Sequence, residues 1–223
     1  MRLGVAIMAG GEGQRLSSLG VPKALAPIGR GTLLDHHLDQ IASISPAVTV
    51  VLLHHQADAI AAHLGDRGLP LVESAPMGTA GGLSLLPEGL DTWLVINVDH
   101  ISDVSLPDLV EGWTPPCTAV LSVVAVPVDE GVVELSGGRL VGWRERPILR
   151  LPVTTGLYVF QAAALHAALS GGRVDMPELI AALMPAGVTA WKHPGTWIDA
   201  GTPERLATAR QWLAQKAQPA RSA

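Results

Sequence analysis

The sequence predicts an α/β protein with a mostly parallel central sheet. Strand-like and helix-like runs alternate through the first half of the chain, as they do in parallel α/β proteins. Hydrophobic residues make up 48% of the 223 residues and charged residues 16%, which is enough apolar material for a sizeable core. The chain shows no repeat, linker or low-complexity block, so we expect one domain at residues 1–215 and a flexible tail at 216–223.

The elements of the first half follow from runs of apolar residues. We expect a first strand at Leu3–Met8, followed by a helix capped by Thr32 in which Leu34, Leu38 and Ile41 share one face. The later elements of this half are strands at Val48–Leu53, Leu71–Glu73, Trp93–Val98 and Thr118–Val126, and helices at Ala57–Leu64, Thr79–Leu86 and Leu106–Trp113.

The pattern changes in the second half. Runs at Gly131–Leu135 and Arg139–Arg144 flank Ser136-Gly137-Gly138, which indicates a small β-hairpin. The last helix is expected to start at Pro203 with Thr202 as its cap. The elements between them are strands at Thr155–Phe160, Val188–Lys192 and Trp197–Asp199, and helices near Ala162–Leu169 and Met176–Leu183.

Bulk properties exclude several classes of function. A formal net charge of -5 argues against a general nucleic-acid binder, which would normally be basic. The single cysteine, Cys117, allows neither an internal disulfide nor a thiolate zinc site, and the eight histidines show no metal-binding spacing. The first apolar run is too short for a signal peptide or a membrane span. We therefore expect a cytoplasmic protein without membrane or nucleic-acid partners.

The segment that follows the first strand, AGGEGQRLSSLGVPK, predicts an anion site. Gly10, Gly11 and Gly13 let the backbone turn tightly and bring its N–H groups close to an anion, and Arg15 and Lys23 add two positive charges. Leu16 stands where a dinucleotide fingerprint would have its third glycine, and no GK[ST] follows, so neither a Rossmann dehydrogenase nor a Walker loop is favoured. Taken alone, the segment is also compatible with an ordinary turn.

Two aspartates each end a predicted strand, where ligands of open α/β sheets bind. Asp99 follows Trp93–Val98, and Asp199 ends Trp197–Asp199. Mg²⁺ prefers one or two carboxylates together with phosphate oxygens, so the pair suggests a magnesium site, although either residue alone could be a helix-capping or turn aspartate. Glu145 and Arg146 add a carboxylate for sugar hydroxyls and a guanidinium for a phosphate, or else belong to a solvated charge cluster.

Taken in order, these residues resemble the sugar-1-phosphate nucleotidyltransferases (NDP-sugar pyrophosphorylases). The likeness covers about residues 3–209. Its six blocks are Ala9–Leu16 with Pro22–Ile28, Met77–Gly81, Asn97–Asp99, Glu145–Pro147, Thr155–Phe160 and Trp197–Glu204. The resemblance implies a Rossmann-like three-layer α/β/α fold whose β-hairpin forms a small sugar-binding portion. The chain departs from the usual pattern at Gln14, Val98, Arg146 and Thr154-Thr155.

The resemblance also implies a reaction and its residues. An NTP and a sugar 1-phosphate would give an NDP-sugar and pyrophosphate by in-line attack on the α-phosphate, with Mg²⁺ as cofactor and a homodimer as one candidate assembly. By the resemblance, Arg15, Lys23 and Arg146 would be catalytic, and Asp99 and Asp199 would hold the metal. Nucleotide binding would fall to Ala9, Gly10, Gly11, Gly13, Gln14, Gly78, Thr79 and Ala80, and sugar binding to Gly131, Glu145 and Thr155.

The base and the sugar are less sharply defined. The turn at Met77–Gly81 has no Gln directly before it, whereas thymidylyl- and uridylyl-transferring relatives often use such a Gln. The pattern is most similar to guanylyltransferases acting on mannose or heptose 1-phosphates, which favours GTP. Uridylyl, cytidylyl and thymidylyl transfer stay open as alternatives, as does a catalytically inactive regulatory homologue that binds nucleotide sugars.

Overall fold

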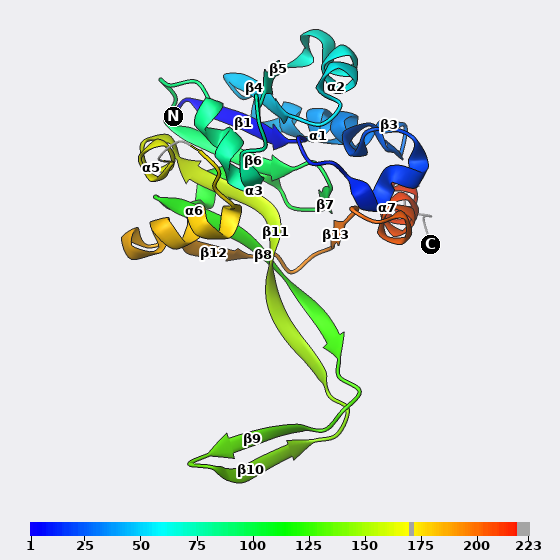
Figure 1. Cartoon of the computed structure of the whole chain (residues 1–223), viewed down its shortest axis with the longest axis vertical. Coiled ribbons are helices and arrows are strands. Elements are labelled where there is room, and N and C mark those ends of the chain that lie inside the picture. Colours follow the sequence, from blue (N-terminus) through cyan, green and yellow to red (C-terminus); the bar gives the residue numbers. More distant parts are fainter. Residues whose placement is uncertain (170–171, 218–223) are drawn as a thin grey trace, which may run out of the picture.

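The computed structural model describes residues 1–169 and 172–217 and is built around one seven-stranded sheet (Figure 1). In spatial order the strands are β12 (Thr189–Lys192), β8 (Cys117–Pro127), β11 (Ile148–Gln161), β6 (Thr92–Asn97), β1 (Leu3–Met8), β4 (Val48–Leu53) and β5 (Leu69–Val72). Only β11 runs antiparallel to its neighbours, β6 and β8. The prediction of a mostly parallel sheet is therefore confirmed.

Helices cover both faces of this sheet. One face packs against α1 (Leu33–Ile41), α2 (Ala57–Leu64), α4 (Leu106–Gly112) and α7 (Pro203–Lys216), and the other against α3 (Gly78–Gly81), α5 (Ala162–Ala168) and α6 (Met176–Leu183). Strand β1 serves both cores, because Val5 and Ile7 enter the first and Ala6 enters the second. The three-layer α/β/α fold is thus confirmed.

Short elements complete the chain. The short strands are β2 (Pro27–Ile28), β3 (Gly31–Thr32), β7 (His100–Ser102), β9 (Val132–Ser136), β10 (Arg139–Arg144) and β13 (Trp197–Asp199). The 3-10 turns are η1 (Gln14–Leu19), η2 (Lys23–Leu25), η3 (Ala42–Ile44), η4 (Gly65–Arg67), η5 (Gly82–Leu85) and η6 (Met184–Ala186). Among the described residues, no helix combines the length and the apolar character needed to cross a membrane.

The predicted helix caps are present. The Thr32 hydroxyl accepts from the N–H of Asp35 at 3.1 Å, and the Asp35 carboxylate accepts from the N–H of Thr32 at 2.9 Å, so α1 begins with a reciprocal capping box. The Thr202 hydroxyl accepts from the N–H of Arg205 at 3.3 Å at the start of α7, where Pro203 is the first helical residue.

Two boundaries differ from the prediction: strand β5 begins earlier than expected, and helix α7 continues further. Strand β5 begins at Leu69 rather than Leu71, since Pro70 is tolerated in a strand at the edge of the sheet. Lys216, which we placed in the flexible tail, is the last residue of α7, and its ammonium donates to Asp103 at 3.0 Å. Of the predicted tail, residues 218–223 lie outside the described residues.

The largest difference is the length of β11, which begins at Ile148 and not at Thr155. Beyond the sheet, residues 122–127 of β8 pair only with residues 148–153 of β11, and this ribbon carries the β9–β10 hairpin at its far end. We refer to residues 122–154 as the arm. Figure 1 shows the arm extending well away from the body of the molecule. The hairpin was predicted from the sequence, but the long two-stranded ribbon that carries it away from the sheet was not.

Candidate active site

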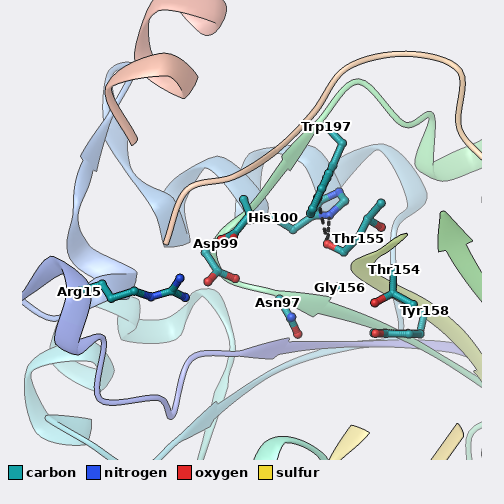
Figure 2. A pocket seen from close by; sticks show the side chains of 10 residues that line it. Arg15, Asn97, Asp99, His100, Thr154, Thr155, Gly156, Tyr158 and Trp197 are labelled. Atoms are coloured by element: carbon teal, nitrogen blue, oxygen red, sulfur yellow. Dashed lines mark hydrogen bonds between the residues drawn. The ribbon is translucent and has the colours of Figure 1, made fainter. Parts of the chain in front are cut away.

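Two adjoining cavities lie at the carboxyl ends of the central strands. The first, about 510 Å³, lies between the glycine-rich loop after β1 and the turn at residues 76–79, and we call it the loop cavity. The second, about 280 Å³, lies over the end of β6 and the middle of β11, and we call it the strand cavity (Figure 2). Asn97 and Asp99 line both cavities. The two cavities therefore meet at the end of β6, where ligands of α/β sheets bind.

The two predicted metal-binding aspartates come together at this junction. Asp99 follows β6 directly, and the antiparallel pairing of β7 with β13 places Asp199 opposite His100. A Cβ atom added to Gly201 would lie 2.8 Å from Asp199 Oδ1 and 3.2 Å from both Asp99 Oδ2 and Arg15 Nη2. The two carboxylates and the guanidinium thus converge on one point, and the missing side chain of Gly201 leaves that point open.

Lys23 completes the charged group from the side of the glycine-rich loop. Its ammonium donates to Asp99 Oδ2 at 2.9 Å, in a pair whose side chains are both largely buried. Gly13 adopts a φ of +60°, and a Cβ there would lie 2.9 Å from the Cβ of Lys23. The loop therefore needs glycine at this position, both for its backbone conformation and for the passage of the lysine stem.

The donor set fits a hard divalent cation whose remaining ligands come from a bound substrate. The described residues hold no group of three or more His, Cys, Asp or Glu side chains arranged for a metal. Two carboxylates suffice for Mg²⁺ when phosphate oxygens and water complete the octahedron. In the structure, Asp99 accepts from Lys23. Asp199 accepts from Arg205 Nη1 at 2.7 Å and from the Gly201 N–H at 2.9 Å.

A buried network shapes the strand cavity. The carbonyl of Thr155 accepts from His100 Nδ1 at 2.8 Å and from Trp197 Nε1 at 3.0 Å, as Figure 2 shows. Because a carbonyl only accepts, Nδ1 carries the imidazole proton. Burial lowers the pKa of His100 to about 4, so the ring is neutral near pH 7. His100 therefore fixes the cavity wall without adding charge.

Thr155 does not offer its hydroxyl to this cavity. The side chain is 4% exposed, and its Oγ1 donates to the carbonyl of Val120 at 3.0 Å. The predicted sugar-binding residue thus contributes a wall rather than a hydroxyl. The polar side chains that line this part of the cavity are those of Thr154 and Tyr158, which lie side by side in Figure 2.

The predicted nucleotide-binding residues divide into two groups. Gly10, Gly11, Gly78 and Thr79 line the loop cavity. The other four do not line it. Ala9 and Ala80 are buried, and their N–H groups donate to the carbonyls of Leu52 and Val174 respectively. Gly13 lies against Lys23, and the side-chain amide of the exposed Gln14 donates to the Glu12 carboxylate at 2.6 Å.

The predicted sugar-side residues on the arm are not brought to the site. Glu145 accepts from Trp143 Nε1 at 3.0 Å, Gly131 lies against the same indole, and Arg146 is 76% exposed. From Ile148 to Thr154 the strand spans about 20 Å at 3.3 Å per residue, so Arg146 lies far from the strand cavity of its own chain. Local sequence places these residues after a strand, but only the length of the ribbon decides their distance from the cavity.

Several cavity-lining residues were not given roles from the sequence. They are Asn97, His100, Thr154, Tyr158 and Trp197 in the strand cavity, and His54, Glu73, Arg173 and Asp175 in the loop cavity. The rule that ligands bind at strand ends, which identified Asp99, applies equally to Asn97 and to Glu73, which follows β5. Asp175 carries only the local signal of a helix cap, because it forms a capping box with Glu178 at the start of α6; its carboxylate also accepts from the N–H of Thr79 at 2.8 Å.

Cys117 is buried, and burial raises its pKa to about 12. A thiol that stays protonated at neutral pH is a poor nucleophile.

Replacing Gly201 with Ala tests the convergence of the charged groups. The added methyl would displace the carboxylate of Asp199 and crowd Arg15 and Asp99, so we expect turnover to fall by about tenfold or more, because small misplacements of catalytic groups are costly. The backbone of Gly201 has no left-handed φ, so the fold should be kept, with a melting temperature close to that of the wild type. Unchanged kinetics in Gly201→Ala would show that these three side chains do not act together.

Fold and site together define an α/β protein whose charged side chains converge at the carboxyl ends of its strands, where open α/β sheets bind their ligands. The chain belongs to the nucleotidyl transferase family, whose model matches residues 5–216. This confirms the family indicated by the sequence motifs.

Individual relatives agree with this assignment. A candidate mannose-1-phosphate guanyltransferase of Sulfolobus acidocaldarius is 28% identical over 88% of this chain and 59% of its own length. The bifunctional IPC transferase and DIPP synthase of Rubrobacter xylanophilus is 31% identical over 92% of this chain. The chain spans 50% of that second relative.

Solved structures show the same fold. A candidate glucose-1-phosphate thymidylyltransferase from Bacillus anthracis, crystallised with a sucrose, superposes with a TM-score of 0.76 at 22% identity, covering 98% of both chains. HddC from Yersinia pseudotuberculosis, complexed with GMP-PN, superposes with a TM-score of 0.69 at 19% identity, covering 94% of this chain and 99% of that one.

Proposed function

We propose that this protein transfers a nucleotidyl group from an NTP, preferably GTP, to a sugar 1-phosphate. The observation that carries the proposal is the meeting of two cavities at Asp99, with Arg15 and Lys23 beside it. One cavity has the glycine-rich loop expected for a triphosphate, and the other has polar walls suited to a sugar. Transfer between two bound ligands needs such a junction.

The reaction requires no covalent enzyme intermediate. A phosphate oxygen of the sugar 1-phosphate attacks the α-phosphorus of the NTP, and a new P–O bond forms as the bond between the α-phosphorus and the α,β-bridging oxygen breaks. The electron pair of the broken bond leaves on pyrophosphate. Both reactants are anions, so the protein contributes mainly positioning and charge stabilisation.

Each charged group at the junction has a role in this scheme. Arg15, which lines the strand cavity beside Asp99, would contact the leaving β,γ-phosphates across the junction of the two cavities, and Lys23 in the loop cavity contacts the α-phosphate and the incoming phosphate. Asp99 and Asp199 would hold Mg²⁺, which when bound neutralises phosphate charge as a Lewis acid. Binding of the triphosphate gives Lys23 and Arg15 phosphate partners and frees Asp99 from its ion pair.

The preference for GTP is supported by Glu73 in the loop cavity. Glu73 Oε2 accepts from the N–H of Met77 at 3.2 Å, which holds the carboxylate beside the turn that carries Gly78 and Thr79. A carboxylate only accepts hydrogen bonds, and guanine offers adjacent N1–H and N2–H donors, whereas uracil offers a single N–H between two carbonyls. The Sulfolobus relative, a candidate guanyltransferase by name, points the same way.

Replacing Glu73 with Gln tests this preference. We expect the ratio of kcat/KM for GTP to that for UTP to fall by about tenfold, since a hydrogen bond to a charged group contributes roughly 1.5–3 kcal/mol. A role confined to holding the turn at Met77 would lower both values by the same factor and leave the ratio unchanged. Glu88→Gln, at a surface glutamate outside both cavities, is the matched control.

The activity itself is tested by pyrophosphate release. The full chain is incubated with Mg²⁺ and each common NTP, including dTTP, against a panel of sugar 1-phosphates that contains mannose, heptose, glucose and amino-sugar derivatives. The proposal expects release with GTP and at least one hexose or heptose 1-phosphate. A regulatory homologue would bind nucleotide or nucleotide sugar in calorimetry and release no pyrophosphate from any pair.

A further inference from the structure

The arm exposes an apolar surface that its own chain does not cover. Most of the large apolar side chains left exposed among the described residues lie on it: Val123, Val126, Val133, Leu135, Leu140, Val141, Trp143, Ile148 and Leu151. Leu135 is 67% exposed and Trp143 is 62% exposed. A two-stranded ribbon is at best marginally stable by itself in water, and an apolar patch of this kind marks an interaction surface.

The geometry of the ribbon favours packing through its faces. In the register of β8 with β11, Val126 lies opposite Leu149 and Val124 opposite Leu151, while Val123 lies opposite Pro152 on the other face. Both faces therefore carry exposed apolar residues, although Arg150 lies opposite Ala125 on the second face. Prolines 127, 147 and 152 lack N–H groups and interrupt the donors that a further strand would need.

The lining of the strand cavity, in turn, carries little positive charge, because Lys23 reaches Asp99 from the loop cavity. Arg15 is the one basic side chain among the described residues that line it, and its guanidinium lies beside two carboxylates. An incoming sugar phosphate would be a dianion near those carboxylates. The exposed Arg146 guanidinium lies at the base of the hairpin, 3.9 Å from the Glu145 carboxylate, but in its own chain the ribbon holds it away from this cavity.

We propose that the arm packs against a second copy of this chain and brings Arg146 and Glu145 to that copy's strand cavity. The pairing is isologous, so each copy gives an arm and receives one, and a two-fold dimer holds two equivalent composite sites. The apolar side chains of the arm supply the contact area, and Arg146 adds a second cation to the lining of the strand cavity. The docking is inferred from the exposed apolar residues of the arm and does not depend on the proposed function, whereas the role of Arg146 at a sugar phosphate rests on that function.

The docking is tested by the mass of the full-length protein in light scattering. We expect a dimer for the wild type and a monomer for the double variant Leu135→Lys/Leu140→Lys, whose two sites are exposed on the hairpin. Met184→Lys, at an exposed apolar residue on the body, is the matched control and should stay dimeric. Circular dichroism should show that all three are folded. A monomeric wild type, or a dimer insensitive to the arm variant, overturns the proposal.

The composite site is tested by complementation between two inactive variants. Asp99→Asn and Arg146→Ala are co-expressed with different tags, and the heterodimer is isolated by two affinity steps. Its Arg146→Ala body receives an intact arm, so one of its two sites is complete, and we expect about half of the wild-type turnover. Turnover no higher than in the parent variants, or full activity of Arg146→Ala alone, would overturn the transfer of Arg146 to the second copy.

A cross-link makes the test independent of turnover. Heterodimers of Arg146→Cys and Thr154→Cys chains are treated with a short bis-maleimide, and the buried Cys117 does not compete. We expect one covalent dimer, because the partner's arm would place residue 146 beside the strand cavity. If the wild type releases no pyrophosphate, the proposed function is wrong. The mass from light scattering and the cross-link would still show whether the arm docks on a second copy.

Discussion

Replacing Asp99 with Asn is expected to lower kcat by about 10²–10³-fold, the range found for single groups that stabilise developing charge. Asp99 lines both cavities, receives the Lys23 ammonium and faces the point where Asp199 and Arg15 converge. No other carboxylate lines both cavities among the described residues. Asn keeps the shape and one oxygen but removes the charge that would hold Mg²⁺, so the defect should lie in turnover more than in folding.

Two measurements separate this role from a general loss of structure. The Mg²⁺ dependence of nucleotide binding, followed by calorimetry, should weaken in Asp99→Asn, while the melting temperature changes little. Asp108→Asn, at an exposed position in the first turn of α4, is the control and should behave as the wild type. Near-normal turnover in Asp99→Asn would remove Asp99 from the metal site and leave the junction without its central residue.

The sequence was most informative where local rules and tertiary structure agree. The first strand and the Thr32 and Thr202 caps follow from periodicity and capping chemistry, which act over a few residues. The alternation of strands and helices likewise predicted a mostly parallel sheet, but not the order of its strands. The strand-end rule also brought Asp99 and Asp199 to one site, although they lie far apart in the chain. Their meeting depends on β7 pairing with β13, two short strands of which only the second was expected.

The sequence was least informative where a residue's position depends on distance in three dimensions. We expected this strand to begin at Thr155, but it begins at Ile148 and includes Pro152, since proline is tolerated in a ribbon whose edges are unpaired. That ribbon moves Glu145 and Arg146 out of reach of their own strand cavity. The orientation of the Thr155 hydroxyl could not be predicted for a similar reason. Its acceptor, the carbonyl of Val120, lies on the neighbouring strand, and only the tertiary structure brings the two together.

Replacing Lys23 with Met is expected to lower kcat by about 10²–10³-fold as well, since in the proposed reaction the ammonium stabilises charge on the α-phosphate. Methionine keeps most of the length of the stem that passes Gly13, so the loop should retain its shape. Lys23→Arg keeps the charge but not the compact ammonium, and we expect partial activity. Lys192→Met, at an exposed lysine that ends β12, controls for the loss of one charge.

A double-variant cycle decides whether Lys23 acts on the substrate or only on Asp99. If Lys23 merely holds the Asp99 carboxylate at 2.9 Å, the variant Lys23→Met/Asp99→Asn should be no slower than the slower single variant. If the ammonium moves to the α-phosphate when the triphosphate binds, each residue contributes separately, and the double variant should lose about a further tenfold or more. We expect the second result, because the glycine-rich loop places Lys23 on the wall of the loop cavity itself, where it can reach both the carboxylate and a bound phosphate.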